Sequence, residues 1–253
     1  PVGVKLEAAA SVAYGPTESY GFHMLETLQC MVERRQGGEV GVEAVHCLEG
    51  EAVWDWMDEN PVHADLLRAA GSSIRTTTAP WDRVREVVKE PVAIILRYAD
   101  GLEAPNLLLN GYSQSFGFAG LTPQGIEACE FYLQDGMPYG HFSYLGRNIE
   151  EMFLTGQPTY PVERTLLTTG VLAAAMQSRH QGHIGLNTPH LAVCYAPSER
   201  TPYRPSGPEP AGATIGWHRF GVGEADAAPA AGQSRGQSSL TSLGTWPLGF
   251  SYG

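Results

Sequence analysis

The polar residues most able to do chemistry gather at the start of one predicted helix. His23 lies in its first turn, and an imidazole there can donate or accept a proton near neutral pH. Glu26 follows three residues later and therefore shares a helix face with His23. The N–H groups at a helix start favour anions and oxyanions, so the pattern predicts a proton-transfer site. The polar residues just before His23 are Glu18, Ser19 and Tyr20.

A second interpretation of His23 stays open beside this one. A single histidine at a helix start is more often a structural residue whose hydrogen bonds are satisfied by the fold. A small metal-dependent hydrolase that uses His23 and Glu26 is a weaker third reading. Ser19 lacks the GxSxG context of a hydrolase nucleophile, so it gives no support to an acyl-transfer enzyme.

Two further patterns have simple structural explanations. His180 and His183 have HxxH spacing with His190 nearby, which could suggest a metal site. Basic residues at the C-terminal end of a helix are explained without a metal, because they interact favourably with the helix dipole. The acidic residues of the later helices are typical of a solvated helix face rather than a catalytic pair. They are Glu150, Glu151 and Glu163.

The elements that must position His23 begin with a strand over residues 4–14, which Gly15-Pro16 ends. The helix itself is predicted over 21–35, and its apolar residues cover so much of its circumference that we expect it to be buried. The clearest hairpin joins strands 92–98 and 102–109 through the Asp100-Gly101 turn. Pro105 cannot donate to a ladder, so the second strand is predicted at a sheet edge or with a bulge.

The remaining predicted elements complete an α+β order. A helical stretch is interrupted at Asn60-Pro61, and one long helix opens at Pro161 and stops at Gly182. The other elements are strands at 40–48, 115–121, 127–134 and 190–195 and helices at 51–70 and 142–154. We predict an open, mostly antiparallel sheet with helices packed on one face.

The domain organisation follows from a change in composition. Residues 1–196 form the predicted α+β domain, and 197–253 are a Pro/Gly/Ser-rich tail that we expect to be largely disordered. In this arrangement strands 92–98, 102–109 and 115–134 present a face without helices. We therefore expect a homo-oligomer formed through the open sheet.

Composition excludes several classes of protein. The chain has 27 acidic and 16 basic residues and a net charge of −11, which argues against nucleic-acid binding and docking on anionic lipid. No apolar run approaches a bilayer span of about 20 residues, and no signal peptide is visible, so we expect a cytoplasmic protein. The scattered cysteines argue against a disulfide framework or a zinc site. They are Cys30, Cys47, Cys129 and Cys194, of which the first two are predicted in the core.

Three segments together resemble a known family. Gly21, His23 and Glu26 fit the Gly, His and second acidic positions of the Asp-x-Gly-x-His-x-x-Asp segment that opens the carboxy-terminal domain of Gfo/Idh/MocA oxidoreductases. The helix–loop–helix at 147–179, with its Gly156-Gln157-Pro158 turn, and the hairpin at 92–109 are similar to later parts of that domain. The resemblance covers about residues 5–195.

The resemblance implies the substrate-side domain of a sugar- or polyol-type oxidoreductase that uses NAD or NADP. The dinucleotide would be bound by a Rossmann domain not present in this chain, which has no GxGxxG or Glu-Lys-Pro motif. His23 would transfer the proton, with Tyr20 and Glu26 near the substrate. Ser19 replaces the family's aspartate, so Glu18 would have to substitute for it. The alternative is a non-catalytic interaction or assembly module with the same fold.

Overall fold

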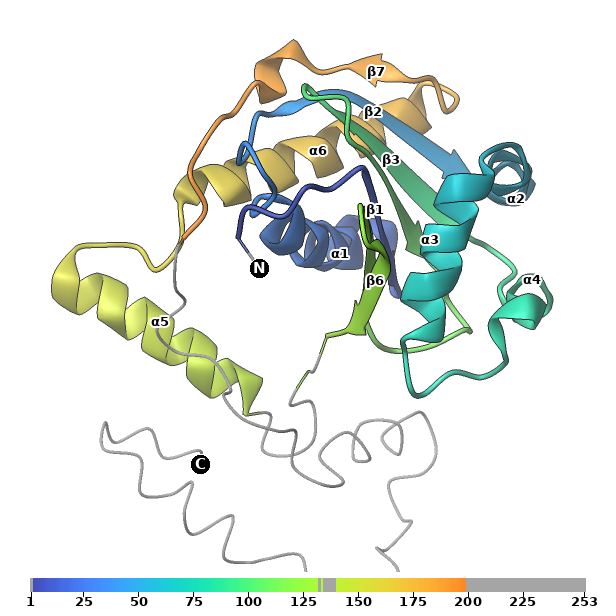
Figure 1. Ribbon diagram of the computed structural model, residues 1–253, viewed down its shortest axis with the longest axis horizontal. Helices are drawn as coiled ribbons and strands as arrows, with labels where there is room; N and C mark the ends of the chain where they lie inside the picture. Colours follow the sequence, from blue (N-terminus) through green and yellow to red (C-terminus); the bar gives the residue numbers. More distant parts are fainter. Residues whose placement is uncertain (1, 132, 134–139, 199–253) are drawn as a thin grey trace, which may run out of the picture. The chain divides into compact units, whose positions relative to one another are not determined.

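A computed structural model describes residues 2–131, 133 and 140–198 (Figure 1). The chain divides into two compact units, and nearly all the described elements belong to the first, Pro1–Phe131 with Asn148–Tyr203. The second unit, Tyr132–Arg147 with Arg204–Gly253, contributes the beginning of one helix. The predicted tail therefore lies, from residue 199 onward, outside the described residues.

Seven strands form one sheet in the order β6-β5-β1-β4-β3-β2-β7. All neighbours are antiparallel except β1 and β4, which pair in parallel from Ser11 opposite Asn106. This confirms an α+β fold with an open, mostly antiparallel sheet. The strands are β1 (Ala8–Ala13), β2 (Val42–Glu49), β3 (Val92–Tyr98), β4 (Glu103–Leu108), β5 (Gly117–Thr122), β6 (Gly125–Glu130) and β7 (Leu186–Asn187).

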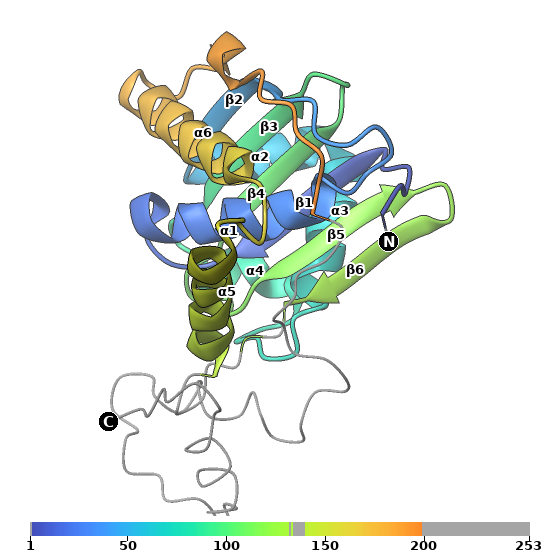
Figure 2. The ribbon, with the colours of Figure 1, turned by 90° about the vertical axis from the view of Figure 1, so that its left-hand side faces the viewer.

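Helices cover both faces of the central strands, so the prediction of helices on one face is wrong. On one face, α1 (Thr17–Val32) and α6 (Val162–His180) pack together: a Cβ added at Gly21 would meet Leu172 of α6 and Ile94 of β3. On the other face, α2 (Glu51–Glu59) and α3 (Pro61–Ser72) pack on alternate residues of the same strands, such as Ala93. Figure 2 shows α1 and α6 in front of β1–β4 and α3 behind them.

Because helices pack on both faces of the sheet, all six residues of β1 are buried. Ala10 and Val12 join the core cluster beneath α3, and Ser11 faces the other layer, where its hydroxyl donates to Asn106 Oδ1 at 2.5 Å. The expected uncovered sheet face is therefore absent from β1 to β4. Its strands are buried like those of a sheet between two helical layers.

Pro105 lies in the interior of the sheet, not at an edge, because β4 is flanked by β1 and β3. It pairs with Ile95 of β3, while the parallel pairing with β1 begins only at Asn106. The N–H of Leu109 donates to Ala13 of β1 at 2.9 Å, so alternation places the missing N–H of Pro105 on the β1 side. The missing N–H of Pro105 would therefore point toward β1 just outside the paired residues, so the sheet loses no hydrogen bond at this proline.

The helix boundaries follow local signals, with two corrections. α2 and α3 meet at Asn60, as predicted, because Pro61 is favoured in the first helical turn. α1 begins at Thr17, four residues earlier than predicted, directly after Pro16, so His23 lies in the second turn and the prediction that it lies in the first turn is wrong. The predicted strand at 190–195 is not formed: Pro189–Leu191 is a 3₁₀ turn, and the short β7 precedes it. The remaining described helices are α4 (Val84–Val87), with a 3₁₀ turn at Trp81–Arg83 before it, and α5 (His141–Thr155).

The core beneath α3 depends on one close approach. Gly71 lies against the Trp81 ring, and an added Cβ would stand only 2.1 Å from a ring carbon. Tyr112 closes the same corner: its hydroxyl donates to the Gly71 carbonyl at 3.1 Å, and its ring meets Trp81 edge-on at 5.5 Å. The pairing fixes the loop after α3 against the sheet.

Candidate functional site

The turn that leads from β1 into α1 is held by a residue of the loop that follows β4. The N–H of Gly15 donates to Asn110 Oδ1 at 2.6 Å, and Asn110 Nδ2 donates back to the Gly15 carbonyl at 3.2 Å. Gly15 has a φ of +91°, and a Cβ there would overlap the Tyr20 ring. Only glycine satisfies both conditions. The loop after β4 thereby fixes the turn before α1.

A series of aromatic rings in contact extends from Phe116 to His23. The Tyr14 ring lies 4.9 Å from Tyr20 and 5.3 Å from Phe116, and Tyr20 lies 5.6 Å from His23 in an edge-to-face arrangement. Tyr14 and Tyr20 are half-buried, so each keeps part of its ring accessible. The sequence predicted Tyr20, but it gave no signal for Tyr14 or for Phe116, which is far along the chain.

His23 is exposed, and within the described ranges its side chain makes no hydrogen bond. Its neighbours are the Tyr20 and Phe22 rings and the charge of Glu26. A structural histidine with satisfied hydrogen bonds, the second interpretation, does not match this geometry. Among the described residues no hydrogen bond or ion pair joins His23 to Glu18 or Ser19, both of which are exposed.

Glu26 points toward α6 and accepts a hydrogen bond from Thr168 Oγ1 at 2.7 Å. Burial raises the pKa of this carboxyl, and the Thr168 hydrogen bond, Arg164 and His23 oppose the rise. The structure therefore brings together His23, Tyr20 and Glu26 of the predicted site, and it adds Thr168. The His23 imidazole thus lies beside a carboxyl whose burial disfavours its ionised form.

A buried ion pair beneath this surface fixes α1 to α6. Glu33 is fully buried, and Arg164 donates to its two oxygens at 2.8 and 2.5 Å. Tyr195 donates a third hydrogen bond to Glu33 at 2.9 Å and accepts one from Gln29. Burial, with Glu33 beside it, raises the pKa of the Tyr195 hydroxyl well above its usual range.

The hydrogen bonds continue from Gln29 into the sheet. Tyr98 of β3 donates to Gln29 Oε1 at 2.9 Å, and Gln29 Nε2 donates to Glu39 at 2.5 Å. Arg35 joins Glu39 and also donates to Asp100 at 2.7 Å. These buried bonds set the position of α1, and hence of His23, relative to the sheet.

Of the two HxxH histidines, His180 is exposed and His183 contacts the backbone of β2. His183 has a φ of +63°, and its Nδ1 lies 3.1 Å from the Cys47 carbonyl. His46 Nε2 lies 2.7 Å from the His183 carbonyl, so these contacts fix the end of α6 on β2. No group of three metal-binding side chains occurs in the part of the chain that the structure describes.

The first two cysteines are poor nucleophiles. Cys47 is fully buried, as predicted, whereas Cys30 is only partly buried. Burial raises the pKa of each thiol to about 11. Both stay protonated at neutral pH, so neither is an activated thiolate.

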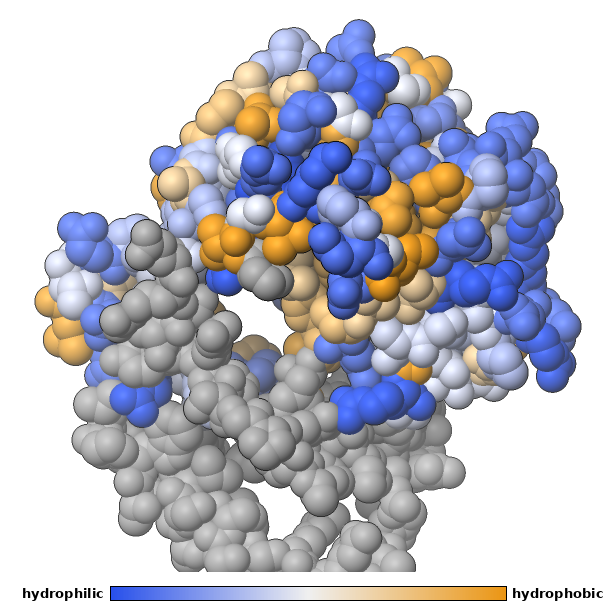
Figure 3. All heavy atoms as spheres, in the orientation of Figure 1, coloured by the Kyte–Doolittle hydropathy of each residue, from blue (hydrophilic) through white to orange (hydrophobic). Residues whose placement is uncertain are grey.

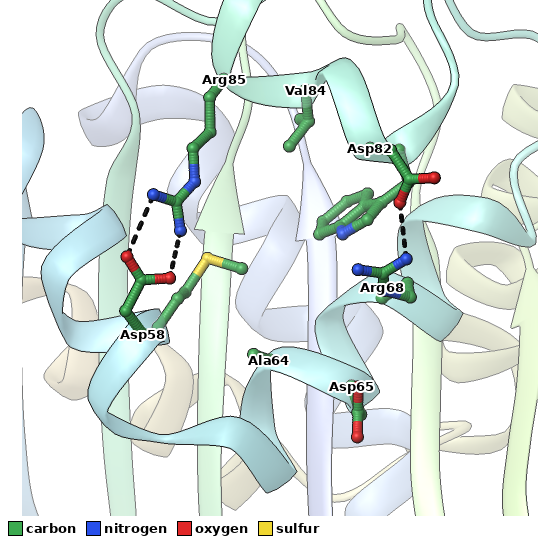
Figure 4. A pocket seen from close by; sticks show the side chains of 9 residues that line it. Asp58, Ala64, Asp65, Arg68, Asp82, Val84 and Arg85 are labelled. Atoms are coloured by element: carbon green, nitrogen blue, oxygen red, sulfur yellow. Dashed lines mark hydrogen bonds and ion pairs between the residues drawn. The ribbon is translucent and has the colours of Figure 1, made fainter.

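A hollow of about 160 Å³ lies on the other face of the sheet, between α2, α3 and α4 (Figure 4). Arg85 forms a bidentate ion pair with Asp58, and Arg68 donates to Asp82 at 2.6 Å. These exposed pairs join the elements around the hollow, which is smaller than a typical ligand site. None of the predicted site residues lines it.

Comparison with known proteins adds no relative. No protein-family model, no curated protein and no solved structure matches this chain. Among the described helices, none combines the length and the apolar character needed to cross a membrane.

Proposed function

We propose that this chain is the substrate-side domain of an NAD- or NADP-dependent oxidoreductase that acts on sugars or polyols, working with a nucleotide-binding half. One observation carries the proposal: His23 is exposed and unbonded in the described structure, beside half-buried aromatic rings, in the second turn of a firmly held helix. An imidazole that the fold does not use is free to exchange a proton with a ligand.

In this proposal a ring nitrogen of His23 accepts the hydroxyl proton of an alcohol substrate as that substrate is oxidised. In the reverse direction the same nitrogen returns the proton to the carbonyl oxygen. Tyr20 supports one side of the imidazole, and its ring, with that of Tyr14, offers an apolar surface for the carbon face of a sugar. Glu26 sets the local charge: ionised, it favours imidazolium, and protonated, it favours the neutral base.

The turn that leads into α1 does not fit the dinucleotide. The only connection from a strand into α1 is Gly15-Pro16, and Pro16 at the helix N-cap has no N–H to offer a phosphate. A pyrophosphate cradle needs several backbone N–H groups from a glycine-rich turn. The proposal therefore assigns cofactor binding to the nucleotide-binding half and proton transfer to this chain.

A non-catalytic assembly module is the second candidate. It is favoured by Ser19, which stands where a catalytic carboxylate would pair with the imidazole, and by the exposed apolar residues of α5. In that case His23 would be an ordinary surface residue. The two candidates differ in whether the chain recognises a polyol.

A substrate screen separates them. A protein that contains this chain and a nucleotide-binding half would be assayed with NAD and NADP against a panel of sugars and polyols, following the absorbance of the reduced nicotinamide. The oxidoreductase proposal expects reduction that depends on one substrate class. If no panel member supports turnover and none binds the protein in calorimetry, the assembly module becomes the better account.

A further inference from the structure

α5 is a helix in which no residue is buried, although one of its faces is strongly apolar. Phe142 is 56% exposed, Leu145 53%, Ile149 43% and Met152 37%. Figure 3 shows hydrophobic side chains on the part of α5 that grey atoms leave visible. An apolar stripe of this kind on an otherwise charged protein marks an interaction surface.

The spacing of this stripe indicates what kind of partner fits. Phe142, Leu145, Ile149 and Met152 follow one another at intervals of three, four and three residues, which is the a/d pattern of a helix–helix seam. A strand or an irregular loop would not repeat at 3.5 residues. The pattern therefore favours another helix of the same character.

The residues beside the stripe are uncharged. Gly146, Asn148, Phe153 and Thr155 occupy the flanking e and g positions of the seam. The charged residues of α5 fall at the positions away from it. They are Arg147, Glu150 and Glu151. A highly charged partner would find no complementary charge at the seam, and the chain's net charge of −11 disfavours an anionic lipid surface.

We propose that α5 pairs in antiparallel orientation with α5 of a second copy of this chain. A two-fold axis near residue 147 places Phe142 of one copy against Met152 of the other and Leu145 against Ile149, so each a position meets a d position. Phenylalanine then packs against methionine in the outer layers, and leucine packs against isoleucine in the inner layers. Gly146, next to the axis, has no atom within 4 Å of an added Cβ and permits a close approach.

The expected contact is small but can be extended. A 15-residue helix is about 22 Å long, which is short for a stable interface of about 800 Å² per partner. Phe153, which is 79% exposed at a flanking e position, can enlarge the contact. The proposal does not depend on the oxidoreductase assignment, and it replaces the expected contact through a sheet face that helices in fact cover.

Sedimentation equilibrium of the full chain tests the pairing. We expect a monomer–dimer equilibrium at micromolar concentration. Ile149→Glu should raise the dimer dissociation constant at least tenfold, and Leu145→Gln should raise it less. Val62→Glu is the matched control, because Val62 is 54% exposed on α3, outside the seam, and its variant should dimerise like wild type. Circular dichroism checks that each variant is folded. A monomeric wild type, or a dimer that Ile149→Glu leaves intact, would overturn the proposal.

Cross-linking tests the orientation. In a background with Cys129→Ser and Cys194→Ser, a mixture of Phe142→Cys and Met152→Cys chains should form a disulfide between copies under mild copper oxidation. Each variant alone should not, because in an antiparallel pair its two cysteines stand about 15 Å apart along the axis. Rapid cross-linking of Phe142→Cys alone would contradict the antiparallel arrangement.

Discussion

Arg164→Met removes the only guanidinium that reaches Glu33 among the described residues. The wild-type carboxylate is fully buried and accepts two hydrogen bonds from Arg164 and one from Tyr195. Methionine keeps the length and packing of the side chain but leaves Glu33 with the Tyr195 hydroxyl as its remaining donor. The substitution therefore tests whether this pair holds α6 against α1.

The expected loss is large because a buried charge is left without its partner. Breaking a buried ion pair from one side typically costs about 3–5 kcal/mol, against a total stability of about 5–15 kcal/mol for a domain. For a unit of this size that corresponds to a fall in Tm of about 10 °C. Glu33→Gln in the Arg164→Met background removes the orphaned charge and should recover most of the loss.

Equilibrium unfolding in urea, followed by circular dichroism, measures these differences. Arg68→Met is the matched control: its ion pair with Asp82 is exposed, so the variant should lose less than about 1 kcal/mol. The reasoning is refuted if Arg164→Met costs no more than Arg68→Met. It is also refuted if the double variant is no more stable than Arg164→Met alone.

Three further predictions concern α1, α3 and the cofactor. Glu26→Gln should stabilise the fold near pH 7, by about 1 kcal/mol or less, because burial raises the Glu26 pKa and so penalises the ionised form. That gain should vanish in thermal melts as the pH falls below about 4.5, where folded and unfolded chains are both protonated; a constant gain would show another cause. Gly71→Ala should cost about 1–3 kcal/mol in urea unfolding because its Cβ meets the Trp81 ring, whereas Gly146→Ala, in open space, should not destabilise. Calorimetric titration of the chain alone with NAD(H) and NADP(H) should show no binding; micromolar affinity would reveal an unrecognised nucleotide site.

Local signals in the sequence predicted the elements well. The break at Asn60-Pro61, the hairpin around Asp100-Gly101 and the span of α6 depend on residues close together in the chain, and the structure confirms them. The second helical layer was missed because its position depends on contacts between distant segments. A signal existed in Ala8–Ala13, an almost wholly apolar strand, which is typical of a strand buried on both faces.

The candidate site was predictable only along α1. The face that His23 shares with Glu26 follows from local spacing, but the position of His23 along the helix was predicted wrongly because α1 begins at Thr17. The partners Phe116 and Thr168 lie about 90 and 140 residues away and carry no local pattern that connects them to His23. Likewise, periodicity predicted the apolar face of α5 but not that this face lacks a partner within the described chain.

The substitution His23→Asn, in a protein that contains this chain and a nucleotide-binding half, is the decisive test of proton transfer by His23. His23 is exposed on α1, where asparagine costs only a fraction of a kcal/mol of helix stability, so the fold should persist, with a Tm close to that of wild type. Turnover per folded molecule should fall by about a hundredfold or more, the usual scale for loss of a positioned acid–base group. His180→Asn, at an exposed histidine at the far end of α6, should leave turnover unchanged. Turnover near wild type in His23→Asn, with a lowered Tm, would contradict the assignment of His23 to proton transfer.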